Sequence, residues 1–133
     1  MSTSSDGAPV AIRPFGEADW GALWAVRFAQ LAEAGIVLVD ATPPPQSRAV
    51  PEDDPEWDFH HIEQVYLRGM GNFWLARAGE RPVGYVGAQD VGGAIELRRM
   101  YVRAAYRRHG VGTALVGALL AYCAAQGAPA IEL

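Results

Sequence analysis

The chain has 133 residues, of which half are hydrophobic and a fifth are charged; this composition is typical of one soluble globular domain and excludes a disordered chain. Its net charge of −4 argues against a general nucleic-acid-binding protein, which usually needs a basic face. A single cysteine, Cys123, excludes an intrachain disulfide. Residues 1–9 are polar and lack the apolar core of a signal peptide, so we expect a flexible tail, a domain over 10–133 and a cytoplasmic location.

The first half of the chain is predicted to contain one strand and two helices. Residues 10–14 form a short strand, and hydrophobic residues at three- and four-residue steps predict an amphipathic helix over 17–34. Residues 42–51 are predicted to be a loop, because consecutive prolines cannot continue a helix or a central strand. A second helix is predicted over residues 54–69.

In the second half, the hydrophobic period changes from that of a helix to that of a strand. Three strands joined by two tight turns are predicted at residues 72–78, 82–89 and 94–103, which makes an antiparallel meander. An uncharged helix follows over 110–127, and a last strand begins at residue 130. A strand–helix–strand connection implies that the last two strands are parallel. The predicted fold class is therefore α/β, in the order β-α-α-β-β-β-α-β, with a mixed, mostly antiparallel sheet.

The uncharged segment 110–127 is long enough to raise the question of a membrane span. It consists mainly of alanine and glycine, and its few strongly apolar residues fall at helical spacing. This pattern favours a helix packed tightly on a sheet, and no membrane partner is expected.

The segment before this helix concentrates positive charge and glycine. Five arginines and no acid occur between Arg98 and Arg108, which favours a small anionic ligand. Gly110 and Gly112 open the helix, where main-chain N–H groups lack intrahelical partners and the helix dipole favours negative charge. Arg108 and the neighbouring Arg107, together with the Thr113 hydroxyl, add charge and hydrogen-bond donors, so the loop suits a pyrophosphate.

These residues carry a resemblance to a known family. Arg107-x-x-Gly110-x-Gly112 resembles the Arg/Gln-x-x-Gly-x-Gly/Ala signature of the GNAT superfamily of acyl-CoA N-acyltransferases. The preceding segment 97–102, its spacing to Arg107 and the order of elements are also similar to the family, so the resemblance covers residues 10–133.

The resemblance implies direct transfer of an acetyl group from acetyl-CoA, the cosubstrate, to a primary amine of a small molecule or protein, without an acyl-enzyme and without a metal. The N–H of Met100 is expected to face the developing oxyanion. The residues expected to bind CoA are Met100, Tyr101, Val102, Arg107, Arg108, His109, Gly110, Val111, Gly112 and Thr113.

Glu96 is the candidate general base. By resemblance to the histone-acetyltransferase-like branch, it occupies the position from which a glutamate deprotonates the amine, here through a water molecule. The alternative is a structural carboxylate, because Glu96 and Arg98 share a strand face and are able to pair. Tyr106 is expected to pack in the core and is not assigned as the acid that protonates the thiolate.

Other residues with chemical potential have more ordinary interpretations. His60-His61-x-Glu63 lacks the spacing of a metal-binding helix. The aromatic and histidine side chains of the second helix are predicted to pack, or alternatively to contact the acceptor; they are Trp57, Phe59, His60 and Tyr66. Arg98 and Arg99 are expected to alternate faces on their strand, with one of them near the acceptor.

The chain ends at Leu133, inside the expected fifth strand, whereas the family normally continues with a helix and two strands. A possible homodimer is expected from the edge that this strand exposes. The same observation keeps a second function open, namely a non-catalytic acyl-CoA-binding or regulatory module.

Overall fold

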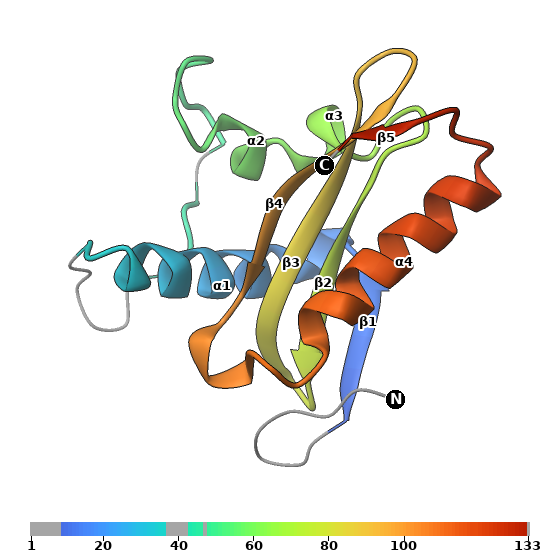
Figure 1. Cartoon of the computed structure of the whole chain (residues 1–133). Coiled ribbons are helices and arrows are strands. Elements are labelled where there is room, and N and C mark those ends of the chain that lie inside the picture. Colours follow the sequence, from blue (N-terminus) through green and yellow to red (C-terminus); the bar gives the residue numbers. More distant parts are fainter. Residues whose placement is uncertain (1–8, 37–42, 47, 133) are drawn as a thin grey trace.

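The computed structural model describes residues 9–36, 43–46 and 48–132, so the predicted tail lies almost wholly outside the described residues. Five strands form one sheet in the order in which they occur along the chain (Figure 1). They are β1 (Val10–Pro14), β2 (Asn72–Ala78), β3 (Arg81–Asp90), β4 (Ile95–Val102) and β5 (Ile131–Glu132). Neighbours from β1 to β4 are antiparallel and β5 is parallel to β4, which confirms the predicted mixed, mostly antiparallel α/β sheet.

Helices cover both faces of this sheet (Figure 1). On one face lie α1 (Trp20–Glu33), which follows a 3-10 turn over Glu17–Asp19, and the single-turn helices α2 (Trp57–His60) and α3 (Ile62–Val65). On the other face lies α4 (Val111–Ala125), which a second 3-10 turn, Ala104–Tyr106, connects to β4. Among the described residues, no helix combines the length and the apolar character needed to cross a membrane.

Each face of the sheet has its own hydrophobic core. Leu115, Leu119 and Cys123 of α4 are fully buried against the sheet, at the helical spacing that the sequence predicts. On the opposite face, Trp24 of α1 and Phe59 of α2 are buried against β2 and β3. Cys123 packs as a small apolar core residue, and its burial raises the pKa of the thiol.

The single second helix predicted over residues 54–69 is wrong, because the chain breaks at His61 into α2 and α3. His61 leaves the helical region, with φ −136° and ψ 52°. Its Nδ1 lies 2.9 Å from the carbonyl oxygen of Trp57, and its ring stacks on the indole of Trp57 with centroids 4.1 Å apart. The imidazole therefore takes the carbonyl that a continuing helix needs for its own main-chain bond.

Candidate active site

The loop between β4 and α4 presents unpaired main-chain donors. Gly110 precedes the helix in the left-handed region, with φ 81°, and its carbonyl accepts the first helical bond from Ala114 at 2.9 Å. The N–H groups of Val111, Gly112 and Thr113 have no hydrogen-bond acceptor among the residues that the structure describes. Three such amides stand at the start of a 15-residue helix, an arrangement that is typical of anion-binding helix N-termini.

A cleft of about 230 Å³ lies at these amides. All the residues that line it are among those expected to bind CoA: Val102, Arg107, Arg108, Gly110, Val111, Gly112 and Thr113. The side chains of Arg108 and His109 are exposed and have no partner among the described residues, so their donors remain available to an anion.

Arg107 differs from the expectation that its guanidinium faces the anion. Its Nε donates to the carbonyl oxygen of Val102 at 3.0 Å, and its Nη2 lies 2.7 Å from Oε1 of Glu33 at the end of α1. The hydroxyl of Tyr101 donates to the other oxygen of Glu33 at 2.7 Å, and the guanidinium lies over the Tyr101 ring. Arg107 therefore fastens the loop to α1, and Glu33 is a supporting residue that the sequence pattern did not indicate.

Replacing Glu33 with glutamine tests this support. The pKa of Tyr101 is raised to about 12 by burial and by its bond to the Glu33 carboxylate, whose own pKa is lowered by Tyr101 and Arg107. We expect Glu33→Gln to lower the pKa of Tyr101, as measured by tyrosinate absorbance against a Tyr101→Phe reference. Because the side chains of Arg107 and Glu33 are about two-fifths exposed, the free energy of unfolding is expected to change little. An unchanged Tyr101 titration would contradict the described contact.

An apolar groove of about 470 Å³ extends from the anion cleft between β4 and α4. Gly112 and Thr113 line both spaces. The other walls are Met100 of β4 and Val116, Gly117 and Leu120 of α4. A Cβ atom at Gly112 would lie 3.1 Å from Cε of Met100, so the absence of a side chain at residue 112 keeps strand and helix close.

A bulge in β4 interrupts its pairing with β3 next to the groove. The pairing of β3 with β4 shifts by one residue between Tyr85 and Gly87, so that Arg99 and Met100 together stand opposite Val86. Arg99 adopts a left-handed conformation, with φ 57°. The bulge is of the kind that bends a strand and re-aims its groups.

The bulge also decides where the main chain of Met100 points. The N–H of Arg103 donates to Val83 on β3, so by the alternation of an antiparallel ladder the polar groups of Tyr101 also face β3 and those of Met100 face away. On that far side, β5 pairs only with Ile95 and Glu96 among the described residues. We therefore expect the Met100 N–H on the side where β4 and β5 are no longer paired.

The expectation that Arg98 and Arg99 alternate faces is wrong, because the extra residue of the bulge restarts the alternation. Ile95 and Leu97 pack toward α4, which places Glu96 and Arg98 on the opposite face. Arg99 lies on that same face, where it contacts Asp58 of α2. Both arginines therefore point to the side covered by α1, α2 and α3.

Glu96 is close to its alternative structural partner. Its Oε1 lies 3.7 Å from Nε of Arg98, and both side chains are about two-fifths exposed. Arg98 also donates to Oε1 of Gln89, the residue directly opposite Glu96 on β3, at 2.7 Å. Gln89 in turn lines a hollow of about 680 Å³, together with Trp57, Glu63, Gln64, Val65, Arg68 and Asp90.

Most residues proposed to contact an acceptor are core residues. Phe59 and Tyr66 are fully buried and His60 is 6 % exposed, which confirms the packing interpretation for these three. Trp57 is half-buried and lines the hollow beside Gln89. Tyr106 is buried in the core against α4, as predicted. In the described part of the chain, no group of three potential metal ligands occurs.

Comparison with known proteins gives a family match and a set of similar folds. The sequence profile of the acetyltransferase (GNAT) family matches residues 37–133. No curated protein sequence matches significantly. A GNAT-family acetyltransferase from Staphylococcus aureus Mu50 superposes with a TM-score of 0.69 at 21% identity, over 90% of this chain and 69% of that one.

Two further solved structures are similar at low identity. The PaiA N-acetyltransferase from Thermoplasma acidophilum, in complex with coenzyme A, has a TM-score of 0.63 at 16% identity, over 90% of this chain and 75% of that one. A ribosomal-protein-alanine N-acetyltransferase from Brucella melitensis biovar Abortus 2308 has a TM-score of 0.62 at 18% identity, over 93% and 78%. At these identities, the structures establish a common fold.

Proposed function

Because the chain belongs to the GNAT family of acetyltransferases, we propose that it transfers an acetyl group from acetyl-CoA to a primary amine of a small molecule or protein. The observation that carries the proposal is the set of unpartnered amides at residues 111–113, which opens into an apolar groove beside β4. An anion site joined to an apolar groove suits a ligand with a pyrophosphate at one end and a long uncharged arm.

In this proposal the pyrophosphate of CoA accepts hydrogen bonds from the amides of Val111, Gly112 and Thr113. The charges of Arg108 and His109 add to the field of the helix N-terminus. Arg107 lines the cleft and holds the loop through Glu33. The pantetheine arm lies in the groove along the main chain of Met100, Tyr101 and Val102.

The chemistry is a direct displacement at the thioester carbonyl. The amine nitrogen attacks the carbonyl carbon, a C–N bond forms and the C–S bond breaks, with no acyl-enzyme. The main-chain N–H of Met100 stabilises the negative charge on the carbonyl oxygen, a contribution of roughly 3 kcal/mol for one such donor in other enzymes. The amine loses its proton through water to Glu96, and the CoA thiolate takes a proton from solvent.

The role of Glu96 is tested by the pH profile of a Glu96→Gln enzyme. If Glu96 accepts the proton, its loss is expected to lower kcat by about 100-fold near neutral pH and to leave acetyl-CoA binding unchanged. Higher pH is expected to restore part of the rate, because a larger fraction of the amine is then already deprotonated. Full turnover across the pH range would assign Glu96 to its ion pair with Arg98 alone.

Acetyl-CoA binding by calorimetry, combined with thiol release, tests the proposed function itself. The amine panel contains a diamine, an aminoglycoside and a peptide with an N-terminal alanine. We expect acetyl-CoA to bind and CoA thiol to be released in an amine-dependent way. Binding without release by any amine would favour the non-catalytic acyl-CoA-binding module, and absence of binding would reject both.

A further inference from the structure

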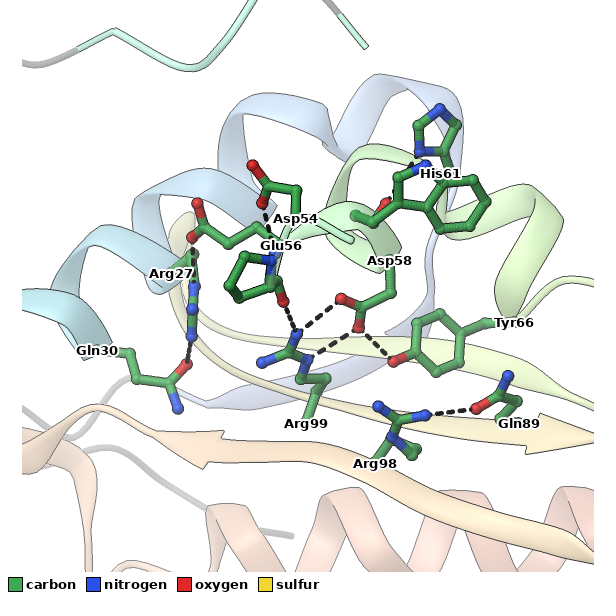
Figure 2. Close-up of polar contacts among 12 residues, drawn as sticks. Arg27, Gln30, Asp54, Glu56, Asp58, His61, Tyr66, Gln89, Arg98 and Arg99 are labelled. Atoms are coloured by element: carbon green, nitrogen blue, oxygen red, sulfur yellow. Dashed lines mark hydrogen bonds and ion pairs between the residues drawn. The ribbon is translucent and has the colours of Figure 1, made fainter. Parts of the chain in front are cut away.

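A buried polar cluster connects α2 to the bulge of β4 (Figure 2). Arg99 forms two hydrogen bonds with Asp58, from Nε to Oδ2 at 2.8 Å and from Nη2 to Oδ1 at 2.7 Å. The hydroxyl of Tyr66 donates to Oδ2 of the same carboxylate at 2.6 Å, and Nη2 of Arg99 also donates to the carbonyl oxygen of Pro55 at 2.6 Å. We call these residues the Arg99–Asp58–Tyr66 cluster.

The contacts within this cluster fix the edge of the guanidinium formed by Nε and Nη2. A two-point bond between arginine and carboxylate sets the orientation of the side chain as well as its charge. The guanidinium also lies 4.5 Å from the ring centre of Phe59, which is fully buried. The side chains of Arg99 and Asp58 are only 23% and 11% exposed, so water competes weakly for these bonds.

The carboxylate of Asp58 is held in its charged form. Burial favours the neutral acid, but the hydrogen bonds from Arg99 and Tyr66 outweigh burial and keep the pKa of Asp58 below its usual value. The pKa of Tyr66 is raised, by burial and by the neighbouring carboxylate, so the phenol stays protonated and keeps donating. At neutral pH the cluster is therefore a stable ion pair with a third bond.

Arg99 is also the residue whose backbone is unfavourable. A non-glycine residue at φ 57° is strained relative to ordinary strand conformations, and it persists where surrounding contacts over-determine it. The bonds to Asp58 of α2 and to Pro55, which lies just before α2, supply those contacts. If these contacts were lost, the strain would favour a more regular strand. In such a strand the register shifts by one residue, and the main-chain N–H and C=O groups of the neighbouring residues point the opposite way.

We propose that Asp58 is a positioning residue for acetyl transfer: by holding Arg99 in its left-handed conformation, it directs the Met100 N–H into the oxyanion position. The inference rests on the proposed function, in which Met100 stabilises the carbonyl oxygen. Asp58 itself touches neither the thioester nor the amine. Its effect passes through Arg99 to the next residue of the chain, and displacing a catalytic group by about 1 Å is enough to lower a rate by roughly 100-fold.

The proposal predicts a division between catalysis and cosubstrate binding. Asp58→Asn keeps the shape of the side chain and removes its charge. We expect kcat to fall by about tenfold to 100-fold while KM and Kd for acetyl-CoA stay within threefold, because the residues at 108–113 are unaffected. In the ligand-free protein, the amide resonance of Met100 is expected to move or broaden in nitrogen-15 spectra.

Two further variants make this test independent of a simple loss of stability. Arg99→Lys keeps a positive charge beside Asp58, so the buried carboxylate stays neutralised, but it loses the two-point geometry. We expect kcat to fall in this variant too, by less than in Asp58→Asn. Glu56→Gln is the matched control. It breaks the ion pair of 2.7 Å between Glu56 and Arg27, which also joins α2 to α1, without touching the bulge. Its kcat and Met100 resonance are expected to match the unmodified protein.

The outcomes separate this inference from the proposed function. The positioning role would be overturned if the Met100 resonance did not move in either Asp58→Asn or Arg99→Lys. It would also be overturned if Asp58→Asn changed kcat no more than Glu56→Gln does. If the unmodified protein binds no acetyl-CoA or releases no thiol, the proposed function fails. A Met100 resonance that still responds to Asp58→Asn would then show that Asp58 sets the bulge without serving this reaction, and the inference would be rejected as stated.

Discussion

Arg99→Met is expected to destabilise the protein by about 3–5 kcal/mol, because it leaves the carboxylate of Asp58 buried without its countercharge. Asp58 is 9 % exposed, and its remaining bond from Tyr66 does not supply a charge. Chemical denaturation at neutral pH measures the effect. The matched control is Arg98→Met, which removes the neighbouring, more exposed arginine with its contacts to Gln89 and Glu96. That control is expected to change the free energy of unfolding by less than about 1 kcal/mol.

The same substitution should invert the pH dependence that Asp58 contributes. In the unmodified protein the pKa of Asp58 is lower when folded than when unfolded, so its stabilising effect is present above the unfolded value of about 3.9 and is lost as pH falls through the folded pKa. Without Arg99, burial acts against the charge and raises the folded pKa. The contribution of Asp58 to stability is then greatest in acid and falls as pH rises above about 4. Equal slopes in both proteins between acid and neutral pH would contradict the ion pair.

Gly110→Ala is expected to weaken acetyl-CoA binding by more than tenfold. Gly110 has φ 81° directly before α4, and alanine in that conformation costs about 1–2 kcal/mol. Relaxing this strain rotates the amides that follow, and the added methyl group narrows the approach to them. A tenfold change corresponds to about 1.4 kcal/mol of binding free energy, which calorimetry resolves.

The opposite end of α4 provides the matched control for this prediction. Gly127 also has a left-handed conformation, with φ 73°, and an added Cβ atom would have nothing within 4 Å. Gly127→Ala should therefore lower the free energy of unfolding by a similar amount without changing the affinity for acetyl-CoA. Equal losses of affinity in the two variants would mean that helix stability, and not the loop, governs binding.

The sequence was sufficient to predict the sheet and the unpaired amides at the start of α4, because both depend on local signals. Alternating apolar residues between 72 and 103 determined three strands, and glycines at 79, 92 and 93 adopt the left-handed conformations of the turns between them. Gly110 and Gly112 marked the start of an apolar helix, where unpaired amides follow from helix geometry alone. The second helix failed for a local reason as well, because the ring of His61 competes for a main-chain carbonyl.

The bulge and its support were beyond local signals. A left-handed conformation in a strand is usually adopted by glycine or asparagine, which makes it predictable from the sequence, whereas here the residue is Arg99. Its partner Asp58 lies 41 residues earlier, and only the packing of α2 on the sheet brings them together. The contact of Arg107 with Glu33 was missed for the same reason, since a charged residue at the end of a helix is unremarkable by itself.

The irregularity in β4 has an evolutionary consequence. On the proposed assignment, Met100 and Val102 face the acetyl donor, whereas Glu96, Arg98 and Arg99 face the helices beside the hollow near Gln89. One strand thus carries one set of residues that faces the donor and another that faces the helices, and the bulge lies where one set gives way to the other. On this view, substitutions that adapt the chain to a new acceptor would fall at positions of the second set other than Glu96 and Arg99, because Arg99 also supports Met100 on the donor side.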